Sequence, residues 1–303
     1  MQTTSHLLMI RPVHFTFNEQ TAVNNAFQTA AADDSTPQKA LQEFDNFVAL
    51  LTKNGIDVTV INDTPTPHTP DSIFPNNWIS FHNNGSVLLY PMYAINRRQE
   101  RKPHVIETLS KKFSITNTID FTHYENENIF LEGTGSMVLD REKKIAYACI
   151  SPRTDRKILE DFCKQMLYTP ILFHATDGNN SAIYHTNVMM CVADKFAVVC
   201  LESIQNDKEK SEVVFSLEQS GKQIIPITLE QMNNFAGNML QVHNQEGNRF
   251  LIMSSQAYHS LTEHQINLLQ SFNTILHASL ETIETNGGGS ARCMLAEIFL
   301  PVK

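Results

Sequence analysis

The segment SARCMLAEIF, residues 290–299, joins a polar turn to an apolar run of strand character. It follows Gly287, Gly288 and Gly289, a glycine triplet in a chain that has only 11 glycines. Glycine is favoured where the backbone takes a positive φ or passes close to another group, because it has no Cβ atom. Here the triplet leads to Cys293, a potential nucleophile. The same order of turn and strand recurs earlier in the chain, and this recurrence predicts the fold.

Each recurrence belongs to a longer unit of helix, strand, turn and strand. Apolar residues at helical spacing occur in five segments, residues 36–55, 101–113, 154–169, 211–222 and 262–273. Short strand-like runs follow them, in residues 56–61, 114–121, 170–175, 223–228 and 274–280. The turns with their second strands come next, in residues 75–81, 131–139, 184–192, 236–242 and 290–299. The N-terminal stretch MQTTSHLLMIRPVHF is predicted to hold the first strand of the chain.

The turns are evenly spaced along the chain. One polar residue from each gives the series Asn77, Glu132, His185, Asn238 and Cys293, whose successive separations are 55, 53, 53 and 55 residues. A near-constant period through a whole chain indicates one supersecondary unit repeated five times, each unit burying its sheet and helix against its neighbours. Closure of five units into a ring would bring all five turns to one end of a central axis. The sequence therefore predicts an α/β fold with a single pocket where these five side chains meet.

The five side chains include the parts of a thiol enzyme. The thiolate is the reactive form of cysteine, and a nearby cation or hydrogen-bond donor is needed to populate it at neutral pH. His185 or a cationic substrate could supply that help to Cys293. Each residue also has a structural alternative, since a histidine beside an apolar run is often a buried structural group and Glu132 fits a surface position equally well. The combination of Cys, His and Glu at equal spacing favours catalysis.

Five motifs resemble those of the guanidino-group modifying superfamily, the penteins, which includes arginine deiminases, dimethylarginine hydrolases, succinylarginine dihydrolases and amidinotransferases. The resemblance is strongest to the citrulline-utilization hydrolases and spans nearly the whole chain. It implies a five-bladed β/α propeller in which residues 1–303 form a single catalytic domain of five internal repeats around a central active-site channel. The motifs are DSIFPNNW (71–78), LEGTGSMVLD (131–140), ISPRTD (150–155), YHTNVMM (184–190) and GGGSARCM (287–294).

The resemblance also implies roles for individual residues. Cys293 would be the nucleophile, His185 the general acid and base, and Glu132 the carboxylate that hydrogen-bonds the reacting nitrogens. Arg153 would pair with the substrate α-carboxylate, a task that suits its planar fork of donors. The remaining positions expected to contact the substrate or line the entrance are Asp71, Phe74, Asn76 and the turn residue Asn238.

Two departures from the family pattern bear on the substrate. Asn77 and Asn187 stand where guanidinium-binding relatives carry aspartate. A buried guanidinium needs negative charge around it, whereas Asn is neutral and offers one donor group and one acceptor group. These groups complement the neutral ureido group of citrulline, which presents C=O beside NH₂. We therefore expect hydrolysis of citrulline to ornithine, ammonia and carbon dioxide through an S-carbamoyl-cysteine.

Other functions stay open. Dihydrolases that act on arginine or substituted arginine resemble the chain and also use Asn at position 77, so only Asn187 favours the neutral substrate. A deiminase or an amidinotransferase is a further alternative, and a catalytically dead module that binds amino acids or proteins is the non-enzyme alternative. The run NRRQER, residues 96–101, is interpreted as a solvent-exposed lid or interface segment. A homodimer is a possible assembly.

Composition limits the partners. The formal net charge is −9 and no cluster of Lys and Arg occurs, which argues against nucleic acid and anionic membranes. No apolar run reaches the roughly 20 residues that span a bilayer. The N-terminus lacks a basic region and a cleavage site, so it is not read as a signal peptide and a cytoplasmic location is expected. The expected partner is a small amino-acid substrate.

Cysteine and histidine spacing predict neither a disulfide framework nor a metal site. The chain has five cysteines, an odd number, and no C-x-x-C motif. The other four, Cys149, Cys163, Cys191 and Cys200, lie in apolar runs and are expected to be buried and inert. The 12 histidines form no H-E-x-x-H pattern, and no glycine-rich phosphate loop occurs. No cofactor is implied.

Overall fold

The computed structural model describes residues 1–29 and 35–303, and in these residues the chain forms five three-stranded sheets in a mixed α/β fold. In every sheet an inner strand runs antiparallel to a middle strand, which runs parallel to an outer strand. Four sheets, in the order inner, middle, outer, are β3 (Ile79–Phe81), β4 (Ser86–Leu89) and β5 (Asn117–Asp120); β6 (Val138–Asp140), β7 (Ile145–Cys149) and β8 (Thr169–Phe173); β9 (Met190–Val192), β10 (Phe196–Val199) and β11 (Gln223–Pro226); and β12 (Leu240–His243), β13 (Arg249–Ser254) and β14 (Thr274–Ala278).

The fifth sheet contains both ends of the chain. Its inner strand is β15 (Ala296–Ile298), which pairs antiparallel with β1 (His6–Arg11), and β1 pairs parallel with β2 (Asp57–Asn62). Residue Leu7 lies opposite Glu297 on one side and Val58 on the other. The first and last segments of the chain therefore complete one repeat together, as closure of a ring of repeats requires.

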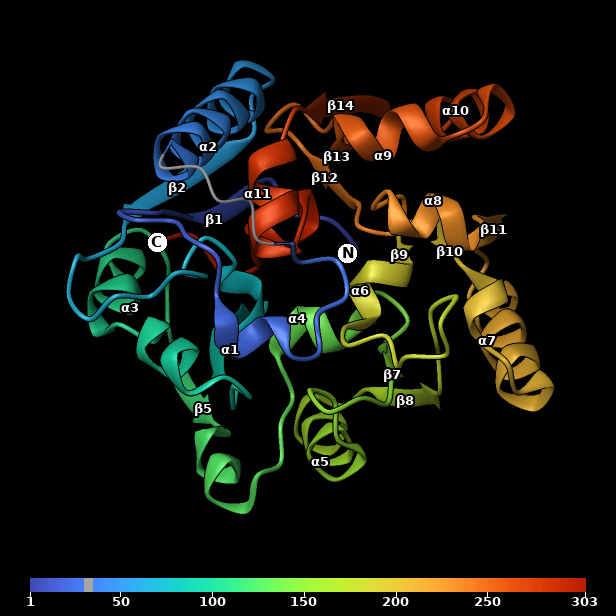
Figure 1. Cartoon of the computed structure of the whole chain (residues 1–303), viewed down its shortest axis with the longest axis horizontal. Helices are drawn as coiled ribbons and strands as arrows, with labels where there is room; N and C mark the ends of the chain where they lie inside the picture. The colour runs from blue at the N-terminus through green and yellow to red at the C-terminus, as the bar shows by residue number, and fades with distance from the viewer. Residues whose placement is uncertain (30–34) are drawn as a thin grey trace.

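A long helix links the middle and outer strands of each sheet, because parallel neighbours need a crossover connection. These helices are α2 (Thr36–Lys53), α3 (Pro103–Ser110), α5 (Arg156–Met166), α7 (Asp207–Gln219) and α10 (Glu263–Gln270). Side-chain caps fix where some begin: Asp155 accepts a hydrogen bond from the Lys157 backbone, and Thr262 forms a capping box with Gln265. Figure 1 shows the long helices at the periphery of the molecule.

Short helices occupy the centre of the molecule and the loops. Figure 1 shows α1 (Glu19–Ala22), α4 (Gly133–Ser136), α6 (Thr186–Met189) and α11 (Glu281–Gly287) inside the circle of sheets. The others are α8 (Leu229–Asn233), α9 (Ser255–Ser260) and the 3₁₀ turns η1 (Pro75–Asn77), η2 (Ile95–Glu100), η3 (Thr122–Glu127), η4 (Leu201–Ser203) and η5 (Ala291–Met294). Four of the turns predicted from the 53- to 55-residue spacing become η1, α4, α6 and η5, and the fifth directly precedes β12.

The predicted order of helix, strand, turn and strand is confirmed in all five units. The prediction missed the middle strands β4, β7, β10 and β13 as separate elements. Inner strands are three or four residues long, too short to show a period of two, and tight turns join them to the middle strands. A stretch such as VMMCVADKFAVVCLE, residues 188–202, therefore resembles one apolar run although it contains two antiparallel strands.

The apolar core lies between neighbouring sheets and the helices that cover them. Helix α2 packs Phe44, Phe47 and Leu51 against Leu276 and Ile283 of the adjacent unit, and all but Leu276 are completely buried. Each fully buried side chain of this size contributes about 1.5–3 kcal/mol to the free energy of unfolding. Each unit is therefore stabilised by the next one. Among the described residues, none of the helices has the length and apolarity that a membrane-spanning segment requires.

Candidate active site

The five turn residues that the spacing singled out lie together at the centre of the fold. Helix α4 packs against η1 and α6, and η1 packs against η5, so these turns form one connected group. Each of the five side chains is at most 3% exposed. They are Asn77, Glu132, His185, Asn238 and Cys293.

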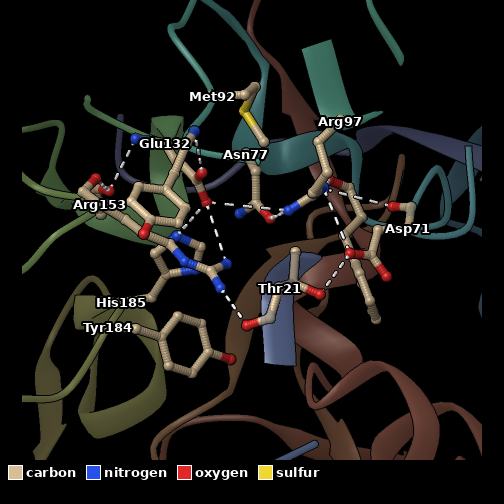
Figure 2. A network of polar contacts seen from close by, with 12 residues as sticks. Thr21, Asp71, Asn77, Met92, Arg97, Glu132, Arg153, Tyr184 and His185 are labelled. Carbon is tan, nitrogen blue, oxygen red and sulfur yellow. Dashed lines mark hydrogen bonds and ion pairs between the residues drawn. The ribbon is translucent and has the colours of Figure 1, made fainter. Parts of the chain in front are cut away.

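A buried carboxylate–imidazole pair forms the middle of this group (Figure 2). Glu132 directly precedes α4 and His185 directly precedes α6, and Nε2 of His185 lies 2.8 Å from Oε2 of Glu132. The other carboxylate oxygen, Oε1, accepts a hydrogen bond of 2.9 Å from the Tyr93 backbone N–H. The guanidinium groups of Arg153 and Arg97 lie 3.5 and 4.0 Å from Oε2. Both oxygens of Glu132 are thus occupied by protein groups.

The environment sets the charge of this pair. Burial alone would raise the pKa of Glu132, but Arg153, His185 and Arg97 outweigh it and bring that pKa down to about 2. Burial lowers the pKa of His185 to about 4, because the attraction of Glu132 does not offset desolvation together with repulsion by the two arginines. At neutral pH the site therefore contains a carboxylate anion and a neutral imidazole.

Because the His185 ring is neutral, its single N–H hydrogen can be assigned to one of the two ring nitrogens. A carboxylate only accepts hydrogen bonds, so Nε2 of His185 carries the hydrogen and Nδ1 keeps a lone pair. Nδ1 of His185 and the amide of Asn77 both lie against Gly135. A Cβ atom on Gly135 would come within 2.4 Å of Nδ2 of Asn77 and 2.8 Å of Nδ1 of His185. Glycine is required at position 135 because these two side chains fill the space of any larger residue.

Arg97 is a site residue that sequence reasoning missed. The prediction that residues 96–101 form an exposed segment is wrong, because Arg97 is only 2% exposed and Glu100 only 3%. Nε of Arg97 lies 2.8 Å from Oε1 of Glu100 and 3.7 Å from Oδ2 of Asp71, and NH1 donates to Oδ1 of Asn77 at 2.8 Å. The available signal was the Arg and Glu three residues apart, a spacing that places the two on one helical face. A charge run is usually exposed, and here opposite charges within the run and around it permit burial.

The contact with Arg97 fixes the orientation of the Asn77 amide. Arginine has only donors, so the amide oxygen must face Arg97. The Nδ2 group then points the other way, where it lies against Gly135 and donates to Oδ1 of Asn76 at 3.1 Å. On the side away from Arg97, Asn77 therefore has a hydrogen-bond donor and not an acceptor.

The thiol of Cys293 lies against two other asparagines. Nδ2 of Asn238 is 3.3 Å and Nδ2 of Asn187 is 3.4 Å from Sγ. Asn238 also donates to the backbone oxygen of Asn187 at 2.9 Å and accepts from the backbone N–H of Arg292 at 2.9 Å. The structure thus places both of these amides at the sulfur atom.

A small cavity separates Cys293 from the arginines. Its volume is about 10 Å³, which is room for about one water molecule. The segment around α1 covers it: Arg153 donates to the backbone oxygen of Thr21 at 2.8 Å and to the side chain of Asn24. A cavity of this size is too small for an amino acid. The walls consist of Thr21, Asn25, Asp71, Phe74, Asn77, Arg97, Arg153, Tyr184, His185, Gly287, Gly289 and Cys293.

The residues predicted to form the site fall into two sets. Asp71, Phe74, Asn77, Arg153, His185 and Cys293 are on the cavity wall, whereas Glu132, Asn76, Asn187 and Asn238 lie behind it. Glu132 contacts His185, and Asn76 contacts Asn77. Within residues 1–29 and 35–303, no group of three or more His, Cys, Asp or Glu side chains is arranged to hold a metal ion.

The glycine triplet packs against the same cavity. Gly288 has a φ of +61°, and a Cβ atom there would lie 2.5 Å from Nδ2 of Asn25. A Cβ on Gly287 would meet the ring of Phe74 at 2.8 Å, and one on Gly289 would meet it at 3.0 Å. The triplet lets the backbone pass close to two wall residues, where side chains would collide with them.

The remaining cysteines are buried and free, as expected. Burial raises the pKa of Cys149 to about 11 and the pKa values of Cys163 and Cys191 to about 12, and it also raises the pKa of Cys200. These thiols therefore stay protonated at neutral pH and do not compete with Cys293 as nucleophiles.

Comparison with known proteins identifies a family and several solved structures of the same fold. The family model for N,N-dimethylarginine dimethylhydrolase, eukaryotic, matches residues 11–300. The N-terminal domain of ArgZ, solved with a covalently bound reaction intermediate, superposes with a TM-score of 0.77 at 16% identity over 98% of each chain. ArgZ is described as an arginine dihydrolase from the ornithine–ammonia cycle in cyanobacteria.

Two further solved structures have the same fold. Unliganded AgrE superposes with a TM-score of 0.74 at 18% identity, over 98% of this chain and 40% of AgrE. DDAH from Pseudomonas aeruginosa, complexed with citrulline, superposes with a TM-score of 0.66 at 14% identity, over 98% of this chain and 100% of DDAH. A search of curated proteins gives no match.

Proposed function

We propose, since this chain belongs to the N,N-dimethylarginine dimethylhydrolase family, that it hydrolyses the ureido group of citrulline. Membership makes it an enzyme of the guanidino-group modifying superfamily that the motifs resemble. Within that superfamily the proposal selects a neutral substrate. The observation that carries it is the orientation of the Asn77 amide.

The donor that Asn77 presents suits a ureido group. A guanidinium ion has only N–H donors, and the Nδ2 group of Asn77 would face one of them without forming a hydrogen bond. A ureido group has a carbonyl oxygen that accepts from Nδ2. Arg97 prevents the amide from turning over, because its NH1 would then face a second donor. Arg97 and Asn77 together therefore favour citrulline over arginine.

Charged wall residues match the amino-acid end of the substrate. Arg153 is buried, and its donors at present contact Thr21 and Asn24 of the covering segment, which a carboxylate would replace with a stronger, charge-assisted pair. Asp71 is also buried, and its Oδ1 has no hydrogen-bond partner among the described residues. We assign the substrate α-carboxylate to Arg153 and the ammonium group to Asp71.

The reaction proceeds by covalent catalysis. The Cys293 thiol gives its proton to Nδ1 of His185, and the thiolate attacks the ureido carbon. The resulting imidazolium, held by Glu132, protonates the departing δ-nitrogen, so ornithine leaves and Cys293 carries a carbamoyl group. His185 then takes a proton from water, which attacks that group and releases carbamate, and carbamate decomposes to ammonia and carbon dioxide. Phe74 contributes an apolar wall, and Asn76 supports Asn77 from behind.

Arginine dihydrolysis is the second candidate. The observation that favours it is the likeness to ArgZ over 98% of both chains, together with the carboxylates Asp71 and Glu132 in and behind the cavity wall. A dihydrolase would process the guanidinium of arginine first and the ureido product second. N,N-Dimethylarginine, the substrate in the family description, is the third compound to test.

The remaining expectations extend this proposal. We propose that the five sheets form a five-bladed β/α propeller and that residues 1–303 act as one catalytic domain located in the cytoplasm. An amidinotransferase would need an amine that attacks faster than water, and a binding module would bind citrulline without turnover.

One set of assays separates these functions. Purified protein is incubated separately with citrulline, arginine and N,N-dimethylarginine, and ornithine, citrulline, dimethylamine and ammonia are measured, with Cys293→Ala as control. Ornithine from citrulline alone supports the proposal, whereas ornithine with two equivalents of ammonia from arginine indicates a dihydrolase. If none of the three compounds gives a product while calorimetry still detects citrulline binding, the result supports the binding module.

A further inference from the structure

The two asparagines behind Cys293 were expected to contact the substrate, but their amide groups point at the sulfur. Nδ2 of Asn238 and Nδ2 of Asn187 approach Sγ at 3.3 and 3.4 Å. All three side chains are at most 3% exposed, so water does not compete for these contacts. Neither asparagine is on the wall of the cavity. Asn187 and Asn238 are therefore placed to interact with the nucleophilic sulfur and not with the substrate.

The orientation of the Asn238 amide is fixed by backbone groups. Its oxygen accepts the Arg292 N–H at 2.9 Å, so its NH₂ group must face the opposite side. One hydrogen of that group is donated to the backbone oxygen of Asn187 at 2.9 Å, and the second is left for the sulfur of Cys293. Asn238 is therefore a donor toward Sγ that cannot turn into an acceptor.

Asn187 is held less tightly. Its Nδ2 contacts the sulfur of Cys293, while its Oδ1 is buried and has no hydrogen-bond partner among the described residues. Within the described part of the structure, the contact with Sγ is the only hydrogen bond that this side chain makes. A negatively charged sulfur would strengthen that contact, because hydrogen bonds to ionised acceptors are the stronger ones.

The arginines around Cys293 are each paired with carboxylates. Across the cavity, Arg153 faces Glu132, and Arg97 faces Glu100 and Asp71. The side chain of Arg292 turns away to Glu297, to which it donates at 2.7 Å. The nearest rings are neutral at pH 7, since burial lowers the pKa of His185 and raises that of Tyr184. Within the described residues, the hydrogen bonds of the Cys293 sulfur are therefore those from the two asparagines.

Cations on neighbouring elements are paired as well: Arg141, which follows β6, lies 3.5 Å from the same Glu297. Strand β13, which packs on η5, has Arg249 at its far end, paired with Asp194 at 2.9 Å. The short elements η1 and α6 contain no charged residue. Glu284 of α11 accepts from Ser290 three residues before Cys293, and burial raises its pKa to about 7. A neutral ureido substrate brings no positive charge, so stabilisation of the thiolate must come from dipoles.

We infer that Asn187 and Asn238 are catalytic residues that hold the Cys293 thiolate through two N–H donors, in place of a cation. This inference rests on the proposed function in taking Cys293 as the nucleophile and the substrate group as neutral. When the thiol proton moves to Nδ1 of His185, the electron pair stays on sulfur and both amides donate to it. The same donors assist when water attacks the carbamoyl group and the C–S bond breaks, because the departing sulfur takes the electron pair.

The test uses the enzyme without substrate. The rate of alkylation of Cys293 by iodoacetamide is measured from pH 5.5 to 9.5, and mass spectrometry of the peptide that contains residue 293 excludes the other thiols. Asn187→Leu and Asn238→Leu remove the donors at similar volume, and we expect alkylation at pH 7 to slow about tenfold, with the rate–pH profile moved upward by about one unit. Asn187→Asp should slow it further, because a carboxylate repels the thiolate.

Controls separate this role from a structural one and from substrate binding. Asn273 is a buried asparagine whose side chain contacts Gln241 and not the sulfur of Cys293. The control variant Asn273→Leu should leave the rate–pH profile unchanged. If a leucine variant unfolds, Asn187→Ala replaces it. A second measure of the thiolate is the absorbance near 240 nm, taken as the difference between a protein with Cys293 and the Cys293→Ala variant. An unchanged alkylation profile, with or without a raised KM for citrulline, would overturn the inference. A shifted profile in a protein that hydrolyses none of the three substrates would keep it and refute the proposed function.

Discussion

Replacement of Asn77 by aspartate tests the ureido proposal most directly. Asn77→Asp keeps the size of the side chain, and one carboxylate oxygen can still accept from NH1 of Arg97, which lies 2.8 Å from the present amide oxygen. The other oxygen takes the place of the Nδ2 donor. The ureido oxygen of citrulline would then face an acceptor and lose its partner.

The size of the effect follows from that single contact. A buried polar group left without its hydrogen bond costs about 1–3 kcal/mol, which corresponds to a fall of about 5- to 150-fold in kcat/KM for citrulline. A guanidinium would gain an anionic partner, so kcat/KM for arginine should rise relative to that for citrulline. The assay is release of ornithine, citrulline and ammonia from each substrate under initial-rate conditions.

A matched variant separates loss of the donor from gain of charge. Asn77→Leu has a similar volume and no polar group, so citrulline turnover should fall as it does in Asn77→Asp, while arginine gains nothing. The reasoning would be refuted if Asn77→Asp hydrolysed citrulline within twofold of the wild-type rate, because Nδ2 of Asn77 would then have no contact with the ureido oxygen.

Three further changes test other parts of the site. Glu132→Gln removes the charge that stabilises the imidazolium form of His185, and we expect kcat to fall at least 100-fold with less change in KM. Circular dichroism checks that the variant is folded, and a folded variant with unchanged kcat would contradict this role of Glu132. Glu284→Gln should raise the free energy of unfolding at pH 8 by about 3 kcal/mol, because burial raises the folded pKa of Glu284 to about 7. Protonated Glu284 is compatible with burial, so the wild-type protein keeps its full stability below pH 4.5 and loses this part of it as the pH rises to 7. In denaturant titrations, the difference between the two proteins should therefore vanish at pH 4.5. Gly288→Ala should lower turnover at least tenfold because φ is +61° and Asn25 leaves no space for a Cβ, and unchanged turnover would show that the triplet does not shape the cavity.

The order of elements could be predicted because repetition is a signal in one dimension. Helical spacing in segments such as residues 154–169, followed by short strands, is visible without knowledge of neighbours, and the spacing of 53 to 55 residues links the five units. Equal spacing also identified the residues that meet at the centre, since equivalent positions in a closed ring of repeats lie at the same end of the axis. Middle strands such as β7 escaped prediction because hairpins merge them with short inner strands.

The sequence by itself determined the repeated unit, its number, and the identity of the Cys, His and Glu that the turns bring together. Only the tertiary structure decided how these groups face one another: Arg97 is buried because Glu100, Asp71 and Asn77 surround it, and Asn187 and Asn238 point at sulfur. Burial and orientation of a polar side chain depend on partners from distant segments, and no local pattern contains them. The charge of the site is decided there too, because burial, the contact between Glu132 and His185, and two arginines from other segments together set the pKa values of Glu132 and His185.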